Sequence, residues 1–169
     1  MKRRTRGRWG VQSGLMAGIA VAALFFVVDL VRGSPLATPL RLSRRLLEST
    51  GPALEGGGVI QAAAGLSPGG RLAVFTVLHM AVFMTLGIFA AAISNVFPIR
   101  WSSRTGAVVG IVVAAVVWLL ALRLGSVALA EARLTPEAVV GAGIVGGAVL
   151  GWHLRLCHLD AEDASSRRT

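Results

Sequence analysis

The sequence predicts an all-α integral membrane protein, a four-helix bundle with a short interfacial helix in its first loop. Residues of the set AVILMFWYC make up 54% of the 169 residues, before the 21 glycines are counted. Ordinary soluble domains are about 45–50% apolar with glycine included. A soluble domain of this size still leaves about 30% of its unfolded-state surface in water, so it could not hide so much apolar surface. The remaining observation is the length of the apolar stretches, which suits helices crossing about 30 Å of hydrocarbon.

Four apolar stretches predict spanning helices, at about 11–31, 72–97, 106–124 and 137–154. None of them alternates between apolar and polar residues as a half-buried strand does. The first is longer than the apolar region of a secretory signal, about 7–15 residues, so we expect it to be retained as a helix. The predicted organisation is a basic leader (1–10), a membrane domain (11–159) and a polar tail (160–169) that we expect to be disordered.

The first loop, 32–71, is the largest predicted segment outside the membrane. Its residues 40–47 mix leucine with arginine, a composition typical of a helix lying at the membrane interface. Its second half is rich in glycine around a short apolar run, 59–66. This run is either a linker, which we favour, or a segment that enters protein-lined space in the membrane.

The distribution of basic residues predicts the orientation. The leader, the 98–105 turn and the tail carry ten Lys and Arg residues, and the opposite side carries seven. Five of the ten precede the first helix, which usually dominates the orientation, so we expect both termini in the cytoplasm. Although the net charge is +9, juxtamembrane arginines gain energy from anionic lipids, so the leader indicates a lipid anchor and no nucleic-acid partner.

Glycine recurs at every fourth position in two of the predicted helices. Membrane helices associate by close van der Waals contact, which glycine permits because it lets two backbones approach. We therefore predict that the first and fourth helices pack against each other through these stripes. One competing interpretation is that one stripe faces outward and forms a homodimer, and another is that the glycines reflect a glycine-rich composition without structural meaning. The stripes consist of Gly10, Gly14 and Gly18 in the first helix and Gly143, Gly147 and Gly151 in the fourth.

Asp29 is the only carboxylate within a predicted span away from a helix end, and a charge in such a place needs a partner. The simpler interpretation is that Arg32, three residues further along the helix, neutralises the charge of Asp29. The alternative is a pair with His79, placed at a similar depth in the second helix, serving as a structural hydrogen bond or as a proton relay. Arg123, at the outer end of the third helix, is a further possible partner. His79 also shares one face of its helix with Phe83 and Gly87.

The residues that usually carry chemistry are sparse. Cys157 is the only thiol, which excludes an internal disulfide, a redox pair and a zinc ribbon. The common nucleotide-binding and hydrolase motifs are absent. His153 and Cys157 lie four residues apart, but a metal site needs three or four ligands, so we expect an interfacial polar cluster there. We predict no catalytic site, no metal and no cofactor.

The motifs around Asp29 and His79 resemble those of a group of uncharacterised bacterial four-helix integral membrane proteins. They run from Asp29 through Gly33, Pro35, Thr38 and Pro39 in one region, and through Thr76, His79, Phe83 and Gly87 in the other. Met80 departs from the group's pattern, in which a second aromatic residue often follows the histidine. The resemblance implies a shared scaffold around Asp29 and His79 and a bacterial inner membrane, and it implies no activity.

These observations favour a non-enzymatic membrane scaffold or accessory subunit. Its partners would be the lipid bilayer and either a second copy of the chain or a larger membrane complex. The alternative is a small transporter or channel-like protein in which Asp29 and His79 line a polar path.

Overall fold

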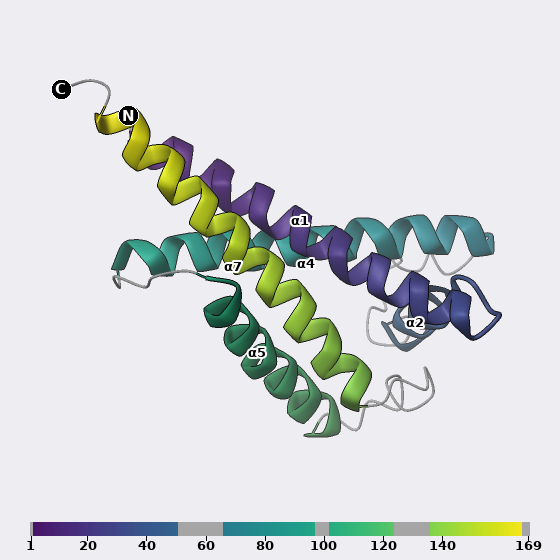
Figure 1. Cartoon of the computed structure of the whole chain (residues 1–169). Helices are drawn as coiled ribbons and strands as arrows, with labels where there is room; N and C mark the ends of the chain where they lie inside the picture. Colours follow the sequence, from purple (N-terminus) through teal and green to yellow (C-terminus); the bar gives the residue numbers. More distant parts are fainter. Residues whose placement is uncertain (1, 51–65, 97–101, 124–135, 167–169) are drawn as a thin grey trace.

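The computed structural model describes residues 2–50, 66–96, 102–123 and 136–166. These residues form α1 (Lys2–Val31), α2 (Ala37–Thr50), α4 (Pro68–Val96), α5 (Ser103–Arg123) and α7 (Pro136–Ser166), and no strand occurs among them (Figure 1). The all-α prediction is confirmed. The predicted short helix in the first loop is also present, because α2 contains all of the leucine and arginine segment 40–47.

Three helices are long and apolar enough to cross a membrane. Their candidate spans are Gly7–Val31, Pro68–Ser94 and Glu137–Cys157. Within the described residues α5 offers a shorter apolar stretch, Ser103–Val116, so the fourth span remains a prediction. Large apolar side chains cover the exterior; Val77 is 69% exposed and Phe89 is 61% exposed. Such a surface is compatible with lipid as the surrounding solvent.

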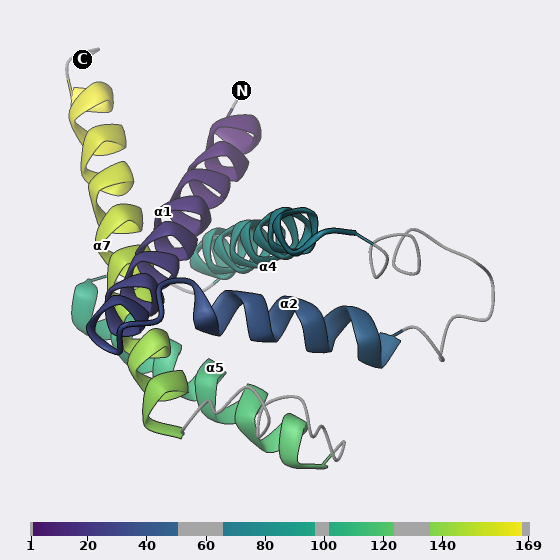
Figure 2. The ribbon, with the colours of Figure 1, turned by 90° about the vertical axis from the view of Figure 1, so that its right-hand side faces the viewer.

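The helices form two closely packed pairs, α1 with α4 and α5 with α7, and contacts between α1 and α7 join the pairs. In Figure 1, α4 runs at a steep angle to α7, so the arrangement is more open than a bundle of aligned helices. Figure 2 shows α2 lying beside α4, near the end of α1. In both views α1 begins and α7 ends at the same end of the molecule.

The first turns of α4 and α5 follow ordinary capping chemistry. At α4, the Ser67 hydroxyl oxygen accepts the Gly70 N–H at 3.3 Å, and Pro68 occupies the first helical position, where no N–H is needed. At α5, the Ser102 hydroxyl oxygen accepts the Thr105 N–H at 3.1 Å. Both helices therefore begin where a local side chain satisfies an otherwise unpaired backbone donor.

Two helix ends differ from the sequence prediction. The basic leader does not precede α1 but belongs to it, because the helix begins at Lys2. The tail prediction is wrong for residues 160–166, since α7 continues to Ser166. Hydropathy identifies the apolar part of a helix and not its end, and Ala161, Glu162 and Ala164 in the tail favour continuation of the helix. The run 59–66 was predicted to be either a linker or a segment that enters the membrane, and all of it except residue 66 lies outside the described residues.

The described core lies where α1, α4 and α7 meet. Its buried apolar residues are Ala17, Ala90, Leu150 and Leu154, with Phe83 packed against them. Small side chains on α1 and α4 allow the helices to cross closely, and two leucines of α7 fill the remaining space. This close crossing positions the polar groups described next.

Candidate functional site

The glycine stripe of α1 packs against α4. A Cβ atom added at Gly10 would lie 2.8 Å from the Gly87 carbonyl oxygen, and one added at Gly14 would lie 2.7 Å from the Met84 Cα. Continuing along α1, the Gly18 carbonyl oxygen accepts a hydrogen bond of 3.2 Å from His79 Nε2. The face of α4 that carries His79 and Gly87 is therefore the partner of this stripe, in antiparallel register.

The glycine stripe of α7 packs against α5. A Cβ atom added at Gly147 would lie 2.9 Å from the Gly110 Cα, and one added at Gly151 would lie 2.9 Å from the Gly106 Cα. A Cβ at Gly143 would lie 2.8 Å from the Ala114 Cβ. Gly106 and Gly110 thus form a matching stripe on α5, which the spacing Gly-x-x-x-Gly in the sequence could have revealed.

These contacts correct the predicted pairing. The stripes of α1 and α7 face α4 and α5 and not each other, although α1 and α7 are in contact. That contact uses a different face of α1, on which Ser13 and Ala17 are fully buried and Val21 is 3% exposed. A Cβ added at Gly146 of α7 would lie 2.9 Å from the Val21 Cγ2. The signal that points to this face is a small residue at both Ser13 and Ala17.

A polar cluster lies in the contact between α1 and α7. A hydrogen bond of 2.9 Å joins Ser13 Oγ and His153 Nδ1. The Cys157 Sγ lies 3.6 Å from the same Nδ1, one helical turn away. Sequence reasoning placed His153 and Cys157 in an interfacial cluster and missed Ser13. Such interhelical bonds contribute on average about 0.6 kcal/mol in a membrane, so this one helps hold the helices in register.

The pairing of a serine with a histidine is also the pairing that activates a nucleophile. Catalysis requires that a substrate reach the serine, but Ser13 is 0% exposed. The Ser13 hydroxyl is therefore a structural group in this conformation. Among the described residues no three His, Cys, Asp or Glu side chains converge as metal ligands.

Asp29 joins the end of α1 to the beginning of α2. Thr38 donates its backbone N–H to Asp29 Oδ2 and its hydroxyl to Oδ1, each at 2.7 Å. The Asp29 carbonyl oxygen accepts the Ser34 N–H at 2.9 Å, and the Leu30 carbonyl oxygen accepts the Gly33 N–H at 3.0 Å. These two backbone bonds form the Schellman motif that ends α1, in which Gly33 takes the left-handed conformation with φ 69°.

The carboxylate performs the capping that α2 cannot perform for itself. Leu36 occupies the cap position, since its carbonyl oxygen accepts the Leu40 N–H at 3.1 Å, but its side chain has no acceptor. Of the first three helical residues, Ala37 donates to the Ser34 carbonyl, Thr38 donates to Asp29, and Pro39 has no N–H. Asp29 thus completes the hydrogen bonding of this turn, and its negative charge complements the positive end of the helix dipole.

His79 lies where α1 and α4 begin to separate. Its ring stacks on Phe75 with centroids 6.0 Å apart and meets Phe83 at 4.8 Å, one turn away on each side. With Nε2 donating to Gly18, the imidazole holds the two helices together at the last close contact of the glycine stripe.

The structure does not bring the predicted polar pair together. In the described residues Asp29 is 2% exposed and bonds to Thr38, whereas His79 bonds to Gly18, and neither bonds to the other. Arg32, the other predicted partner of Asp29, is exposed and forms no ion pair with it among these residues. The side chain of Arg123 lies outside the described part of the chain.

Beyond His79 the helices diverge and leave a partly open pocket of about 160 Å³. α1 contributes Ala22, Phe25 and Phe26, and α2 closes the pocket with Thr38, Pro39 and Leu42. The lining is completed by Leu36, which precedes α2, and by five residues of α4: Leu72, Phe75, Thr76, His79 and Met80. The wall is mostly apolar, so it suits a hydrocarbon ligand better than an ion or a polar substrate.

Comparisons of the chain with protein families, with curated proteins and with solved structures found no match.

Proposed function

We propose that this protein is a non-enzymatic scaffold or accessory subunit of a bacterial inner membrane, with both termini in the cytoplasm. The observation that carries the proposal is that both glycine stripes pack against helices of the same chain. Both stripes are occupied within the chain, so the close helix contacts build a stable framework, and the exposed apolar side chains of α4 and α5 remain free to contact lipid or a partner. The Ser13 side chain is buried and both oxygens of Asp29 accept hydrogen bonds from Thr38, which supports a structural role for these two groups.

A scaffold binds its partner in a fixed ratio. We expect the chain, purified from its native membrane in mild detergent, to retain either a second copy or another membrane protein at constant stoichiometry. Val77→Ala with Val82→Ala, on the exposed surface of α4, should lower the retained partner several-fold while the chain stays in the membrane. Val108→Ala with Val112→Ala, on the exposed surface of α5, is the matched control for a partner seated on α4.

Membrane insertion is measured separately by resistance to alkaline extraction. A reporter that is active only outside the cytoplasm should be inactive when fused after Thr169 and active when fused within the loop at Gly57. An inserted chain that shows neither a constant partner nor a second copy would contradict the scaffold role, and an active reporter after Thr169 would contradict the orientation.

A further inference from the structure

The pocket between α1, α2 and α4 is a consequence of how the helix pair is built. Glycines hold the backbones together as far as Gly18, whose carbonyl oxygen accepts a hydrogen bond from His79. Beyond that point Phe25 of α1 and Phe75 of α4 both line the gap, so bulky rings stand where glycines stood before. The helices therefore separate at a fixed place and leave apolar walls.

The position of α2 is set by the capping bonds at its first turn. Because Thr38 is held by both oxygens of Asp29, the neighbouring Pro39 and the following Leu42 are directed onto the pocket. α2 thus closes the pocket on one side without filling it.

The size and chemistry of the pocket indicate its occupant. An apolar cavity of about 150 Å³ stays dry and takes up a benzene-sized hydrocarbon, and this pocket has about 160 Å³ and opens toward the surroundings. A segment of an acyl chain would fit inside, and the rest of the chain would continue into the bilayer. In a protein surrounded by lipid, acyl chains are the most abundant ligand of that kind.

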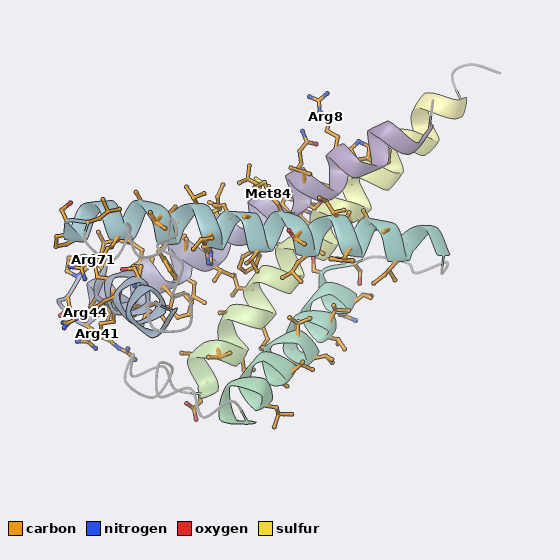
Figure 3. The ribbon with its side chains drawn as sticks, turned by 180° about the vertical axis from the view of Figure 1, so that it is seen from behind. Arg8, Arg41, Arg44, Arg71 and Met84 are labelled. Carbon is orange, nitrogen blue, oxygen red and sulfur yellow. The ribbon has the colours of Figure 1, made fainter. Side chains whose placement is uncertain are left out.

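Two arginines are sequence neighbours of residues that line the pocket. Arg41 directly precedes the lining residue Leu42, and Arg71 directly precedes the lining residue Leu72. Figure 3 shows Arg41 and Arg71 at the same end of the molecule and Arg8 well away from them. Within the described residues neither guanidinium has an ion pair or a hydrogen-bond partner. The carboxylate of Asp29 is bound by Thr38, so among the described residues no carboxylate is paired with Arg41 or Arg71.

We propose that the pocket binds one acyl chain of an anionic phospholipid of the surrounding bilayer, with the lipid phosphate held by Arg41 and Arg71. The arginine fork matches phosphate oxygens in a way that a lysine point charge does not. The proposal relies on the chain lying in a bilayer and is independent of the scaffold role.

The test is lipid binding by the full chain in detergent, measured by native mass spectrometry with phosphatidylglycerol and phosphatidylcholine of identical acyl chains. We expect one phosphatidylglycerol to be retained in preference to phosphatidylcholine. Arg41→Gln with Arg71→Gln should lower that preference by about 30-fold, the sum of two juxtamembrane charges. Arg8→Gln with Arg155→Gln removes the same charge elsewhere and should leave the preference unchanged.

The acyl part is tested by filling the pocket. Ala22→Leu and Thr76→Leu each add apolar bulk to the lining and should lower binding of both lipids by at least several-fold. Helical content by circular dichroism identifies any variant that fails to fold, and either variant alone suffices. Glycerol phosphate without acyl chains should not compete at equal concentration.

Three results would overturn the proposal. One is an equal effect of the two arginine pairs. Another is unchanged lipid binding in both folded pocket-filling variants. The third is competition by glycerol phosphate as strong as that of the lipid. If the chain resists alkaline extraction but fails these lipid tests, the lipid proposal is wrong and the scaffold role is unaffected. If a variant loses its protein partner but still binds lipid, the scaffold role and lipid binding depend on different surfaces.

Discussion

At the scale of single residues, Asp29 shows what a local pattern can reveal. Its position within an apolar helix predicted that it needed a partner, and helical spacing suggested Arg32. The actual partner, Thr38, lies nine residues away across a turn. That turn depends on two left-handed residues, Gly33 with φ 69° and Leu36 with φ 68°. Leucine rarely adopts this conformation, so propensity alone would not have predicted the turn.

Removal of the Asp29 carboxylate should release the first turn of α2. Asp29→Ala leaves the Thr38 N–H and hydroxyl without their acceptors, and we expect a loss of about 1–3 kcal/mol in the free energy of unfolding. Hydrogen exchange should accelerate at the Thr38 and Leu40 amides. Thr38→Ser is the matched control because it keeps both donors and should exchange as the native chain does. Unchanged amide protection in Asp29→Ala would refute the capping role.

At the scale of elements, composition identified the faces but not their partners. A glycine stripe fits any other helix that presents small residues. The sequence therefore could not distinguish a pairing of Gly14 with Gly147 from a pairing of either glycine with another helix. The structure assigns each stripe to a different helix, α4 for α1 and α5 for α7. α4 fits α1 because His79, Phe83 and Gly87 lie on one face. That face offers a hydrogen-bond donor, an aromatic ring and, at Gly87, the space for a close backbone contact.

The α1 and α4 contact is tested by a pair of equal substitutions in one helix. A Cβ at Gly14 would lie 2.7 Å from the Met84 Cα, whereas a Cβ at Gly7 meets nothing within 4 Å. Gly14→Ala should therefore destabilise the protein by about 1–3 kcal/mol through overpacking. Gly7→Ala should be neutral or stabilise by up to about 1 kcal/mol, since alanine favours the helix. Denaturation in mixed detergent micelles measures both, and equal effects would argue against the contact.

At the scale of the whole molecule, the two helix pairs are joined by a second, less obvious surface. Ser13, Ala17 and Val21 share one face of α1, and they meet α7 at Gly146 and His153. The core of the described structure lies at this junction. In the described residues, the contact between α1 and α7 therefore combines small side chains with the Ser13–His153 hydrogen bond.

The junction predicts a specific crosslink. The Val21 Cγ2 lies 2.9 Å from the position of a Cβ at Gly146, within the reach of a disulfide. In a Cys157→Ser background, Val21→Cys with Gly146→Cys should form an intrachain disulfide that leaves the chain monomeric on a non-reducing gel. Val21→Cys with Gly141→Cys is the control, since nothing lies within 4 Å of a Cβ at Gly141. A product found only as a covalent dimer would instead assign this surface to a second copy.

From the sequence alone one could predict that the protein is helical, that its surface suits lipid, and that Asp29, His79 and the glycine stripes have structural importance. These features follow from composition and from helical period, which are local properties of the chain. The packing of the helices was needed to show which stripe meets which helix, that Thr38 donates hydrogen bonds to Asp29, and that a pocket opens beyond His79. Those outcomes depend on turn geometry and on the simultaneous fit of several helices, and residues far apart in the chain carry no local signal of their mutual distance.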